Sequence, residues 1–395
     1  MYYRFHIQSK FYKIIILICL SLYFCCLASC VDKEKKQKEN NITKNIESPQ
    51  KRNELTLVMA GDALLHSAVY NDAKYNLQNA IDSKVKQEFG YDFNKMFVDI
   101  EPIISKHDLA FYNQETILGG KELGLSSYPA FNSPQEFGDC MVKIGFNLVS
   151  LANNHTLDRG EKAIINSLQY WHNKPVLASG SYMSLEDRNT PRIYEKNGIT
   201  YTMLAYTYGT NGIALPKNKE YFVNVYTKEM LARDIANVRD KVDFLIVSMH
   251  WGNEYTTKPN KEQEELAKYL AGLGVDIVIG NHPHVVQPIE WIGHTLVIYS
   301  LGNMISAQKG LERRIGMLAS VKVTKDSNSK QIALKDLNAQ LIYTYYDKKF
   351  SNFKIYPFSL LNDSILPNYK QIYNEYLQII TQRDHERSIR TMPLL

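Results

Sequence analysis

The chain has 395 residues, a formal net charge of +5, 45% hydrophobic residues and 22% charged residues. These values are typical of a globular protein with a sizeable core. No stretch combines clustered basic residues with interleaved aromatic ones, so nothing indicates nucleic-acid binding. The sequence also lacks a Walker phosphate loop, a dinucleotide-binding glycine motif, a Gly-x-Ser-x-Gly elbow and a Cys-x-x-Cys pair, which disfavours a serine or thiol nucleophile.

The N-terminal residues are predicted to be a secretion signal rather than part of the fold. Arg4, Lys10 and Lys13 precede an apolar run over 14–28. That run is too short to cross a bilayer comfortably, and a positive region before a short apolar run is typical of a signal peptide. We therefore expect residues 1–29 to be a lipoprotein signal peptide.

A lipid anchor is predicted at the end of this run. Leu27-Ala-Ser-Cys30 resembles a bacterial lipobox, in which cleavage precedes a cysteine that carries diacylglycerol; an ordinary cleaved signal is the alternative. Lipidated Cys30 would hold the protein at the cell membrane or outer membrane, on the extracytoplasmic side. Residues 30–54 are rich in Lys, Glu and Asn, which favours a flexible tether. Cys140 then has no partner, so no intrachain disulfide is expected.

After the tether, strand patterns alternate with helix patterns, as in a βαβ fold. The strands are mostly continuous apolar runs, which fits parallel strands buried on both faces. The sequence therefore predicts one α/β domain over 55–310. Its predicted elements are strands 55–61, 108–113, 146–152, 243–250 and 275–280, helices 94–106, 134–144, 160–172 and 261–273, shorter strands near 175–179 and 199–206, and a hairpin through 286–300.

The pattern changes beyond residue 310. Segments 316–325 and 331–346 alternate apolar and polar residues, as antiparallel strands do, and 368–387 has a helical period with charged residues on its outer face. We expect residues 311–395 to form an appended β/α segment that packs on the same domain.

Several predicted strands end in side chains that are able to bind metal ions. Ligand sites of open α/β sheets lie beyond the carboxyl ends of the strands, so these side chains should share one edge. Oxygen and imidazole donors suit divalent Mn, Zn, Fe or Mg better than copper. Two such ions about 3.5 to 4 Å apart would clamp the attacking and leaving oxygens of a displacement reaction, and a single ion is the alternative. The residues are Asp62, Asn113, Glu115, Asn154, His155, His250, His282 and His284.

At these residues the chain resembles the CapA family of bacterial capsule and poly-gamma-glutamate biosynthesis proteins, which is itself similar to calcineurin-like metallophosphoesterases. So many signatures in one order make a chance match improbable. The resemblance spans about residues 55–310 and rests on Gly61-Asp62, Asn113-Gln-Glu115, Ala152-Asn-Asn-His155-Thr-Leu-Asp158-Arg-Gly160, His250-Trp-Gly-Asn-Glu254-Tyr255, Gly280-Asn-His282-Pro-His284-Val-Val-Gln287 and Tyr299-Ser-Leu-Gly302-Asn303.

The resemblance implies a layered α/β/α sandwich of the metallophosphoesterase type, with a metal site at one edge. It implies that Asp62 binds a first metal, that Glu115 bridges two metals and that Asn154 binds the second. His155 would then protonate the leaving group, a task that suits an imidazole near neutral pH.

The resemblance also implies that His250 and His282 complete the second metal's ligands and that His284 completes the first metal's. One position departs from the pattern, because Leu64 stands where the phosphoesterases have a histidine that binds the first metal. His66 follows two residues later and is a candidate replacement, but the sequence does not give its direction.

Other polar residues in these motifs are candidates for binding substrate or supporting the metal ligands. Asp158 would alternatively cap the next helix, and Trp251, Glu254 and Tyr255 would alternatively only pack a loop. The candidates are His66, Asn113, Asp158, Trp251, Glu254, Tyr255 and Asn303.

The resemblance implies a part in making, exporting or attaching an anionic extracellular polymer such as capsule or poly-gamma-glutamate. The polymer or its precursor, and a membrane biosynthesis complex, are the expected partners. As an enzyme, the protein would be a metal-dependent hydrolase or transferase. A non-catalytic metal-binding or polymer-binding component of such a complex is the alternative, which Leu64 favours; a periplasmic nucleotidase is a third, without a visible base-stacking signature.

Overall fold

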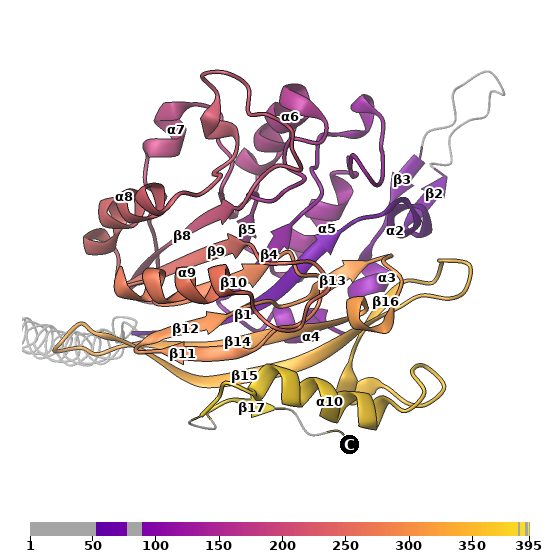
Figure 1. Cartoon of the computed structure of the whole chain (residues 1–395). Coiled ribbons are helices and arrows are strands. Elements are labelled where there is room, and N and C mark those ends of the chain that lie inside the picture. The colour runs from indigo at the N-terminus through magenta and orange to yellow at the C-terminus, as the bar shows by residue number, and fades with distance from the viewer. Residues whose placement is uncertain (1–52, 77–88, 386–387, 392–393, 395) are drawn as a thin grey trace, which may run out of the picture. The chain divides into compact units, whose positions relative to one another are not determined.

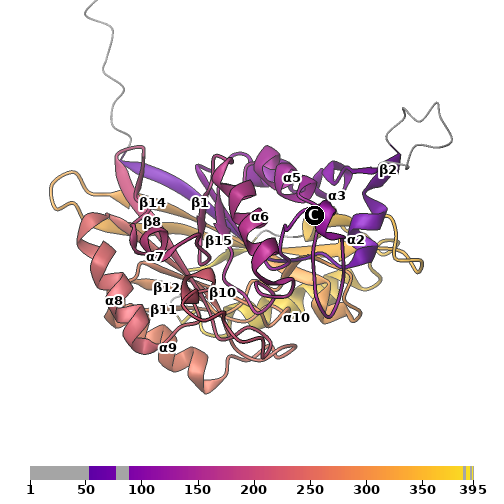
Figure 2. The same cartoon turned by 90° about the horizontal axis from the view of Figure 1, so that it is seen from above.

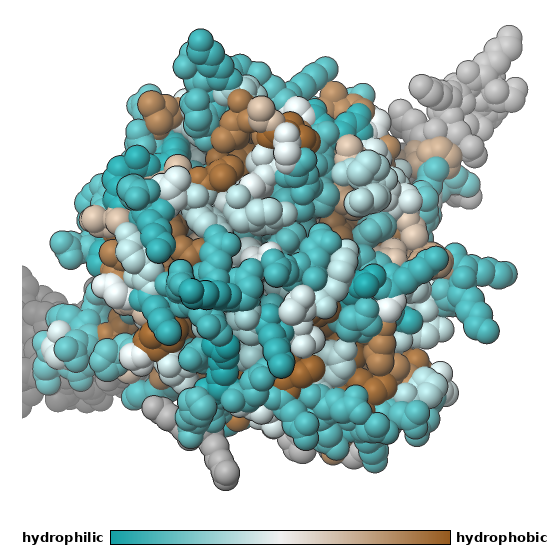
Figure 3. All heavy atoms as spheres, in the orientation of Figure 1, coloured by the Kyte–Doolittle hydropathy of each residue, from teal (hydrophilic) through white to brown (hydrophobic). Residues whose placement is uncertain are grey.

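The computed structural model describes residues 53–76, 89–385, 388–391 and 394. The chain divides into two units, Met1–Arg52 and Asn53–Leu395, and the described residues belong to the second. The predicted signal peptide, Cys30 and nearly all of the predicted tether lie outside them. Within the described ranges, no helix is long and apolar enough to cross a bilayer. Hydrophilic side chains cover most of the face of the second unit seen in Figure 3.

Two β-sheets form the centre of the unit (Figure 1). The larger has the order β16 (Lys354–Pro357), β15 (Ile332–Tyr345), β14 (Ile315–Lys325), β1 (Glu54–Leu64), β4 (Leu109–Gln114), β5 (Leu148–Ser150) and β6 (Leu177–Ser179), with β13 (Asn303–Ser306) also on β1 and β17 (Arg390–Thr391) on β15. The smaller has the order β11 (Ile289–Ile292), β12 (Thr295–Ile298), β10 (Ile277–Asn281), β9 (Phe244–His250), β8 (Ile199–Thr207) and β7 (Tyr194–Lys196). A separate hairpin joins β2 (Lys74–Asn76) to β3 (Phe89–Tyr91).

Helices cover the outer face of each sheet. Helices α3 (Asn94–Phe97), α4 (Glu101–Ile104), α5 (Glu136–Ile144) and α6 (Gly160–His172) share a core with the larger sheet, and α8 (Lys228–Val238) and α9 (Lys261–Gly272) share one with the smaller. Figure 2 shows α8 and α9 on one side of the strands and α3 and α5 on the other. Two short helices, α2 (Ser67–Asp72) and α7 (Leu185–Asn189), precede loops.

Alternation along the strands holds these layers together. On β1, Leu57 and Met59 point into the core between the two sheets, whereas Val58 and Ala60 point toward the helices. On β9, Ile246 faces the core between the sheets and Val247 faces α8 and α9. All of these side chains are fully buried. A strand apolar on both faces has to be covered on both faces, which two stacked sheets with outer helices achieve.

The predicted α/β class is confirmed, and the β layer consists of two sheets packed face to face. The parallel pairing of β1, β4 and β5 and the antiparallel pairing of β14 with β15 are also as predicted. The helix predicted over 94–106 is instead two short helices, α3 and α4. Pro102 lies in the first turn of α4, where the missing proline N–H needs no partner, so a new helix starts there.

The C-terminal segment enters the larger sheet directly. β14 pairs antiparallel with β1 from Glu54↔Thr324 to Met59↔Ala319. Helix α10 (Tyr369–Thr381) lies along β15 (Figure 1) and adds Tyr373, Tyr376 and Ile380 to the core between the sheets. The last part of the chain thus shares its core with the strands that carry the predicted metal ligands.

Candidate metal centre

The parallel strands place the predicted ligands at one edge. In the larger sheet, Asp62 at the end of β1 pairs with Asn113 at the end of β4. In the smaller sheet, His250 at the end of β9 pairs with Asn281 at the end of β10. The carboxyl ends of both sheets therefore meet at one site, as expected for ligand sites in α/β folds.

Asp62 connects the two sheets at this site. Its Oδ1 accepts a hydrogen bond of 2.8 Å from Asn113 Nδ2 in the same sheet. Its Oδ2 accepts one of 3.1 Å from the backbone N–H of His282 and lies 3.3 Å from His284 Nδ1. The side chain is fully buried, so these partners fix its direction.

Glu115 is the centre of the site and lacks hydrogen bonds. It is fully buried, and neither carboxylate oxygen has a hydrogen-bond partner among the residues that the structure describes. Its Oε1 lies 3.7 Å from His250 Nε2 and 3.6 Å from His284 Nε2. Donor atoms of Glu115, His282 and His284 all lie within 4.8 Å of one another, so these three buried residues form a group that is able to hold a metal ion.

Two further buried atoms near this group are without partners. They are Asn113 Oδ1 and His282 Nδ1. Buried polar atoms are nearly always hydrogen-bonded, and each exception requires an explanation such as a bound ion. Three adjacent residues with unpaired acceptor atoms therefore fit a cation better than they fit an empty core.

Asn154 completes the opposite side of the site. Its Oδ1 lies 2.8 Å from His250 Nε2, and its Nδ2 donates to Asn211 Oδ1 at 3.1 Å. With its nitrogen bonded to Asn211, Asn154 turns its amide oxygen toward His250.

The loop after β10 has an unusual backbone. His282 and His284 have φ values of +94° and +58°, a region that residues with side chains rarely adopt. Gly280 precedes them, and a Cβ there would lie 1.9 Å from the carbonyl oxygen of Tyr299. This close backbone approach needs glycine, and the strained backbone turns both imidazoles toward Glu115.

Burial and charge set the protonation of these histidines. Burial lowers the pKa of His250 well below its usual value and lowers the pKa of His282 to about 3. Although burial opposes charging of His284, the carboxylates of Glu115 and Asp62 raise the pKa of that imidazole to about 9. Neutral imidazole is the form that binds metals, so His250 and His282 are ready to act as ligands near neutral pH.

His155 lies beside the group and is oriented by a carboxylate. Its Nδ1 is 2.7 Å from Asp158 Oδ2, which also accepts the backbone N–H of Phe131 at 2.8 Å. The ring of Phe131 packs edge-on against the imidazole at 4.8 Å. Because the carboxylate accepts from Nδ1–H, the other ring nitrogen is left for exchange with a ligand.

A cavity of about 490 Å³ opens onto the site. Its walls include His66, His155, Glu254, Tyr255 and His284. Tyr255 is 42% exposed, and the guanidinium of Arg313 lies 3.9 Å from the centre of its ring. Glu254 and Tyr255 are thus placed where the sequence predicted substrate contacts.

His66 reaches this cavity but is not part of the metal-binding group. Its Nδ1 lies 3.2 Å from the carbonyl oxygen of Leu64, and its ring packs against Phe131 at 5.3 Å. Burial lowers its pKa to about 4. The group of three possible ligands found among the described residues does not contain His66. Leu64 is buried, and its hydrocarbon side chain has no atom that could bind a metal, so this position supplies no ligand.

Trp251 and Asn303 have different roles from each other. Trp251 is fully buried, and its indole N–H donates to the carbonyl oxygen of Tyr299 at 3.0 Å, so it packs the core rather than contacting a substrate. Asn303 Oδ1 lies 3.0 Å from His284 Nδ1 and thus supports that imidazole.

The sequence interpretation missed two residues of this site, Tyr208 and Asn211. The ring of Tyr208 lies 4.7 Å from that of His282 and is nearly parallel to that of His250, at 6.3 Å. Both residues follow β8, whose strand pattern was predicted. The other site residues were predicted because they lie at or just after the ends of strands. The same criterion, applied to β8, would have pointed to this segment.

A family model described as "Bacterial capsule synthesis protein PGA_cap" matches residues 56–308. The PGA biosynthesis protein CapA of Bacillus subtilis (strain 168) is 28% identical over 257 residues, which are 62% of this chain and 65% of the relative. The capsule biosynthesis protein CapA of Bacillus anthracis is 26% identical over 290 residues, which are 71% of this chain and 64% of the relative. The chain thus spans slightly less than two thirds of the length of each relative.

Among solved structures, a putative 5'-nucleotidase from Staphylococcus aureus in complex with alpha-ketoglutarate is similar over 81% of this chain and 58% of its own, with 14% identity. Its TM-score of 0.43 is too low to carry an argument about fold or function. The family model covers well over half of the chain, including every predicted metal ligand. The chain therefore belongs to the family of bacterial capsule synthesis proteins described as PGA_cap.

Proposed function

We propose that this protein is a lipid-anchored, extracytoplasmic component of capsule or poly-gamma-glutamate assembly. In this proposal its cleft hydrolyses or transfers a phosphoester, or a related acyl or amide group, with one or two divalent metal ions. The observation that carries the proposal is Glu115, a fully buried carboxylate with no hydrogen bond to either oxygen and with imidazoles on two sides.

The donor atoms fit divalent metal ions in kind and in spacing. Glu115 accepts no hydrogen bond from the described residues, and a metal cation beside a buried carboxylate lowers the cost of burying its charge. The measured separations between neighbouring donors run from 2.8 Å for Asn154–His250 to 3.7 Å for Glu115–His250. Two ligands of one ion, each at about 2.1 Å, lie roughly 3 to 3.4 Å apart, so the donors need to shift by only a few tenths of an ångström to share ions.

Glu115 lies between two sets of donors, which is the position that a bridging carboxylate needs. Oxygen and imidazole donors together favour Mn, Zn, Fe or Mg. A divalent ion in such a site polarises the scissile group and lowers the pKa of a water molecule. The proposed ligands are Asp62, Glu115 and His284 on one side, and Glu115, Asn154, His250 and His282 on the other.

His155 is placed to move a proton in the proposed reaction. The bond to Asp158 holds a proton on Nδ1 and orients the ring, so that Nε2 is the atom that would pass a proton to a leaving group. Both side chains are largely buried, so solvent competes little for this contact.

The polymer, the partners and the location are inferred from the relatives and the N-terminal sequence. The two Bacillus relatives are named for PGA biosynthesis and capsule biosynthesis. The lipobox-like Leu27-Ala-Ser-Cys30 supports a lipid anchor at the cell membrane or outer membrane, where an anionic extracellular polymer and a membrane complex would be within reach. Loss of membrane fractionation in Cys30→Ala would support the anchor, and unchanged fractionation would contradict it.

The test of the catalytic proposal combines metal analysis with turnover. The purified protein would be assayed for bound Mn, Zn, Fe and Mg, and for cleavage of bis(p-nitrophenyl) phosphate and of poly-gamma-glutamate. His155→Ala should abolish turnover and retain the metal, whereas His172→Ala, at the end of α6 and outside the site, should retain both. Bound metal without turnover of either substrate would defeat the catalytic version.

A second candidate, a non-catalytic component of the polymer-synthesis complex, has one observation in its favour. Leu64 is buried where the related phosphoesterases have a ligand, and His66 contacts the carbonyl of Leu64 and the ring of Phe131. Polymer production in cells separates the two candidates. Full rescue of a deletion strain by stable His155→Ala would favour the non-catalytic role, and failure to rescue would favour catalysis.

A further inference from the structure

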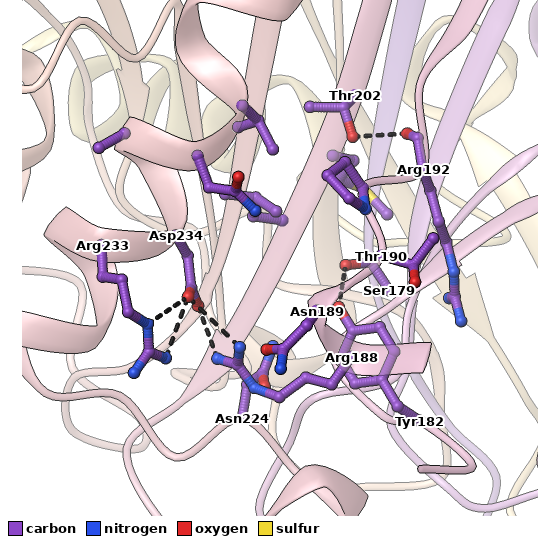
Figure 4. Close-up of a pocket in the computed structure, with 16 residues that line it drawn as sticks. Ser179, Tyr182, Arg188, Asn189, Thr190, Arg192, Thr202, Asn224, Arg233 and Asp234 are labelled. Atoms are coloured by element: carbon purple, nitrogen blue, oxygen red, sulfur yellow. Dashed lines mark hydrogen bonds and ion pairs between the residues drawn. The ribbon is translucent and has the colours of Figure 1, made fainter. Parts of the chain in front are cut away.

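A second cavity, also of about 490 Å³, lies between α7, α8 and β8 (Figure 4). None of its lining residues lines the cleft of the candidate metal centre. Its volume falls within the range of about 300 to 1,000 Å³ that is typical of small-molecule sites. The pocket therefore has the size to bind a ligand of its own.

The pocket contains more positive charge than its carboxylates neutralise. The single carboxylate of Asp234 lies between two guanidinium groups, with Arg188 NH2 at 2.6 Å and Arg233 NH2 at 3.1 Å (Figure 4). It also accepts the hydroxyl of Tyr206 at 3.1 Å. One carboxylate therefore faces two cations, which leaves one positive charge for an anion.

Arg188 provides unused hydrogen-bond donors inside the pocket. Its side chain is only 8% exposed, and both of its hydrogen bonds go to Asp234. A guanidinium has five N–H donors, so three of them have no acceptor among the described residues. Arg192, the third arginine of the lining, is already neutralised by Asp187 at 2.6 Å.

Asn224 provides an unused acceptor in the same pocket. It is 3% exposed, and its Nδ2 donates to the carbonyl oxygen of Ala205 at 3.1 Å. Within the described part of the chain, its Oδ1 has no hydrogen-bond partner. A buried acceptor without a donor costs about 1 to 3 kcal/mol, and a ligand with a hydroxyl or amino group would remove that cost.

Apolar side chains complete the lining. Leu204 of β8, Val238 of α8 and Pro191 contribute hydrocarbon surface. We propose that this pocket binds a small organic anion: a carboxylate placed against Arg188 and Arg233, a hydroxyl or amino group that donates to Asn224, and an aliphatic remainder. An α-hydroxy or α-amino carboxylate has this combination of groups.

Binding to the purified full-length protein in detergent tests the proposal by calorimetry. The probes are 2-hydroxy-4-methylpentanoate, 4-methylpentanoate without the hydroxyl, and 2-hydroxy-4-methylpentanamide without the charge. The hydroxy acid should bind at least about tenfold more tightly than either partner, because each removed group leaves a buried polar atom unpaired. Equal affinity for all three, or no binding of the hydroxy acid, would overturn the proposal.

Two variants locate the binding. Asn224→Leu should weaken the hydroxy acid at least about tenfold and leave 4-methylpentanoate unchanged. Ala236→Trp places a bulky ring from the exposed face of α8 into the lining without removing a polar contact, so it should block every probe and keep the fold. Unaltered binding in Ala236→Trp would place the ligand elsewhere and refute the assignment.

The metal centre supplies the last control. His282→Ala should leave binding of the hydroxy acid unchanged, because His282 does not line this pocket. Loss of binding in that variant would assign the carboxylate to the metal centre instead. Inorganic phosphate is the competing anion, and tighter binding of phosphate than of the hydroxy acid would reject a carboxylate as the ligand.

Discussion

Replacing Glu115 by Gln should stabilise the metal-free protein and weaken metal binding at the candidate metal centre. The substitution keeps the shape of the side chain and removes its charge. In the metal-free protein the buried carboxylate has no hydrogen-bond partner, so the neutral amide should be cheaper to bury. We expect metal-free Glu115→Gln to be more stable than the wild type by about 1 to 3 kcal/mol.

With metal the wild type should gain more stability than the variant. An ion at one hundred times its Kd stabilises the wild type by about 2.7 kcal/mol. The unit Asn53–Leu395, of roughly 340 residues, has an unfolding entropy of about 0.7 kcal/mol/K, so the melting temperature should rise by about 4 °C. If Glu115→Gln binds the ion at least about a hundredfold more weakly, the same concentration gives about 0.4 kcal/mol and a rise of less than about 1 °C.

The assay is thermal unfolding of chelated protein, titrated separately with Mn, Zn, Fe and Mg. Glu254→Gln is the matched control, because it removes a carboxylate from the wall of the same cleft without removing a member of the metal-binding group. The control should keep the metal-induced rise. An equal rise in Glu115→Gln and wild type, or no rise in the wild type with any of the four ions, would refute the assignment of this centre.

Three other substitutions test the surrounding structure. Asp158→Asn should lower turnover about 10- to 100-fold with metal content unchanged, because an amide does not fix the tautomer and orientation of the His155 ring. Equal kcat values would remove this orienting role. Gly61→Ala would place a Cβ 1.8 Å from the carbonyl oxygen of Gly302 and should lower the free energy of unfolding in urea by about 3 kcal/mol or more. A decrease of less than about 1 kcal/mol would contradict this packing. Trp251→Phe removes the indole N–H that donates to a buried carbonyl, and it should lower the free energy of unfolding by about 2 to 4 kcal/mol without changing metal affinity. A change in metal affinity would show that Trp251 contributes to the binding site.

The strand ends could be predicted because one physical rule applies to all of them. Parallel strands share the edge at which they end, so the sequence alone predicts that Asp62, Glu115, His250 and His282 lie together. The same rule, applied to the end of β8, would have found Tyr208.

Side-chain direction after a turn could not be predicted in the same way. His66 and Trp251 each follow a residue at a strand end, yet one reaches the cleft and the other enters the core. Their directions depend on tertiary packing, against Phe131 for His66 and against Tyr299 for Trp251. Local sequence carries no information about these partners.

The number of sheets could not be predicted from the sequence pattern. Helix α8 was not among the predicted helices, but its sequence does contain the signals of a helix. Apolar strands such as β1 and β9 look alike whether they belong to one sheet or to two, because both faces are buried in either case. Helix α8 did have a start signal, since the Thr227 side chain accepts from the N–H of Met230, and its apolar residues Leu231 and Ile235 have helical spacing.

The pairing of β14 with β1 limits how this family's domain can be divided. The match to the family ends at residue 308, before β14 begins at Ile315. A chain cut between these points would expose the backbone of β1 along Glu54–Met59 and would uncover Leu55 and Leu57 to water. An unprotected edge of this kind invites aggregation, so the matched segment alone is not a portable module. Any shortened version for crystallisation or display would have to retain the last strands as part of the fold's own framework.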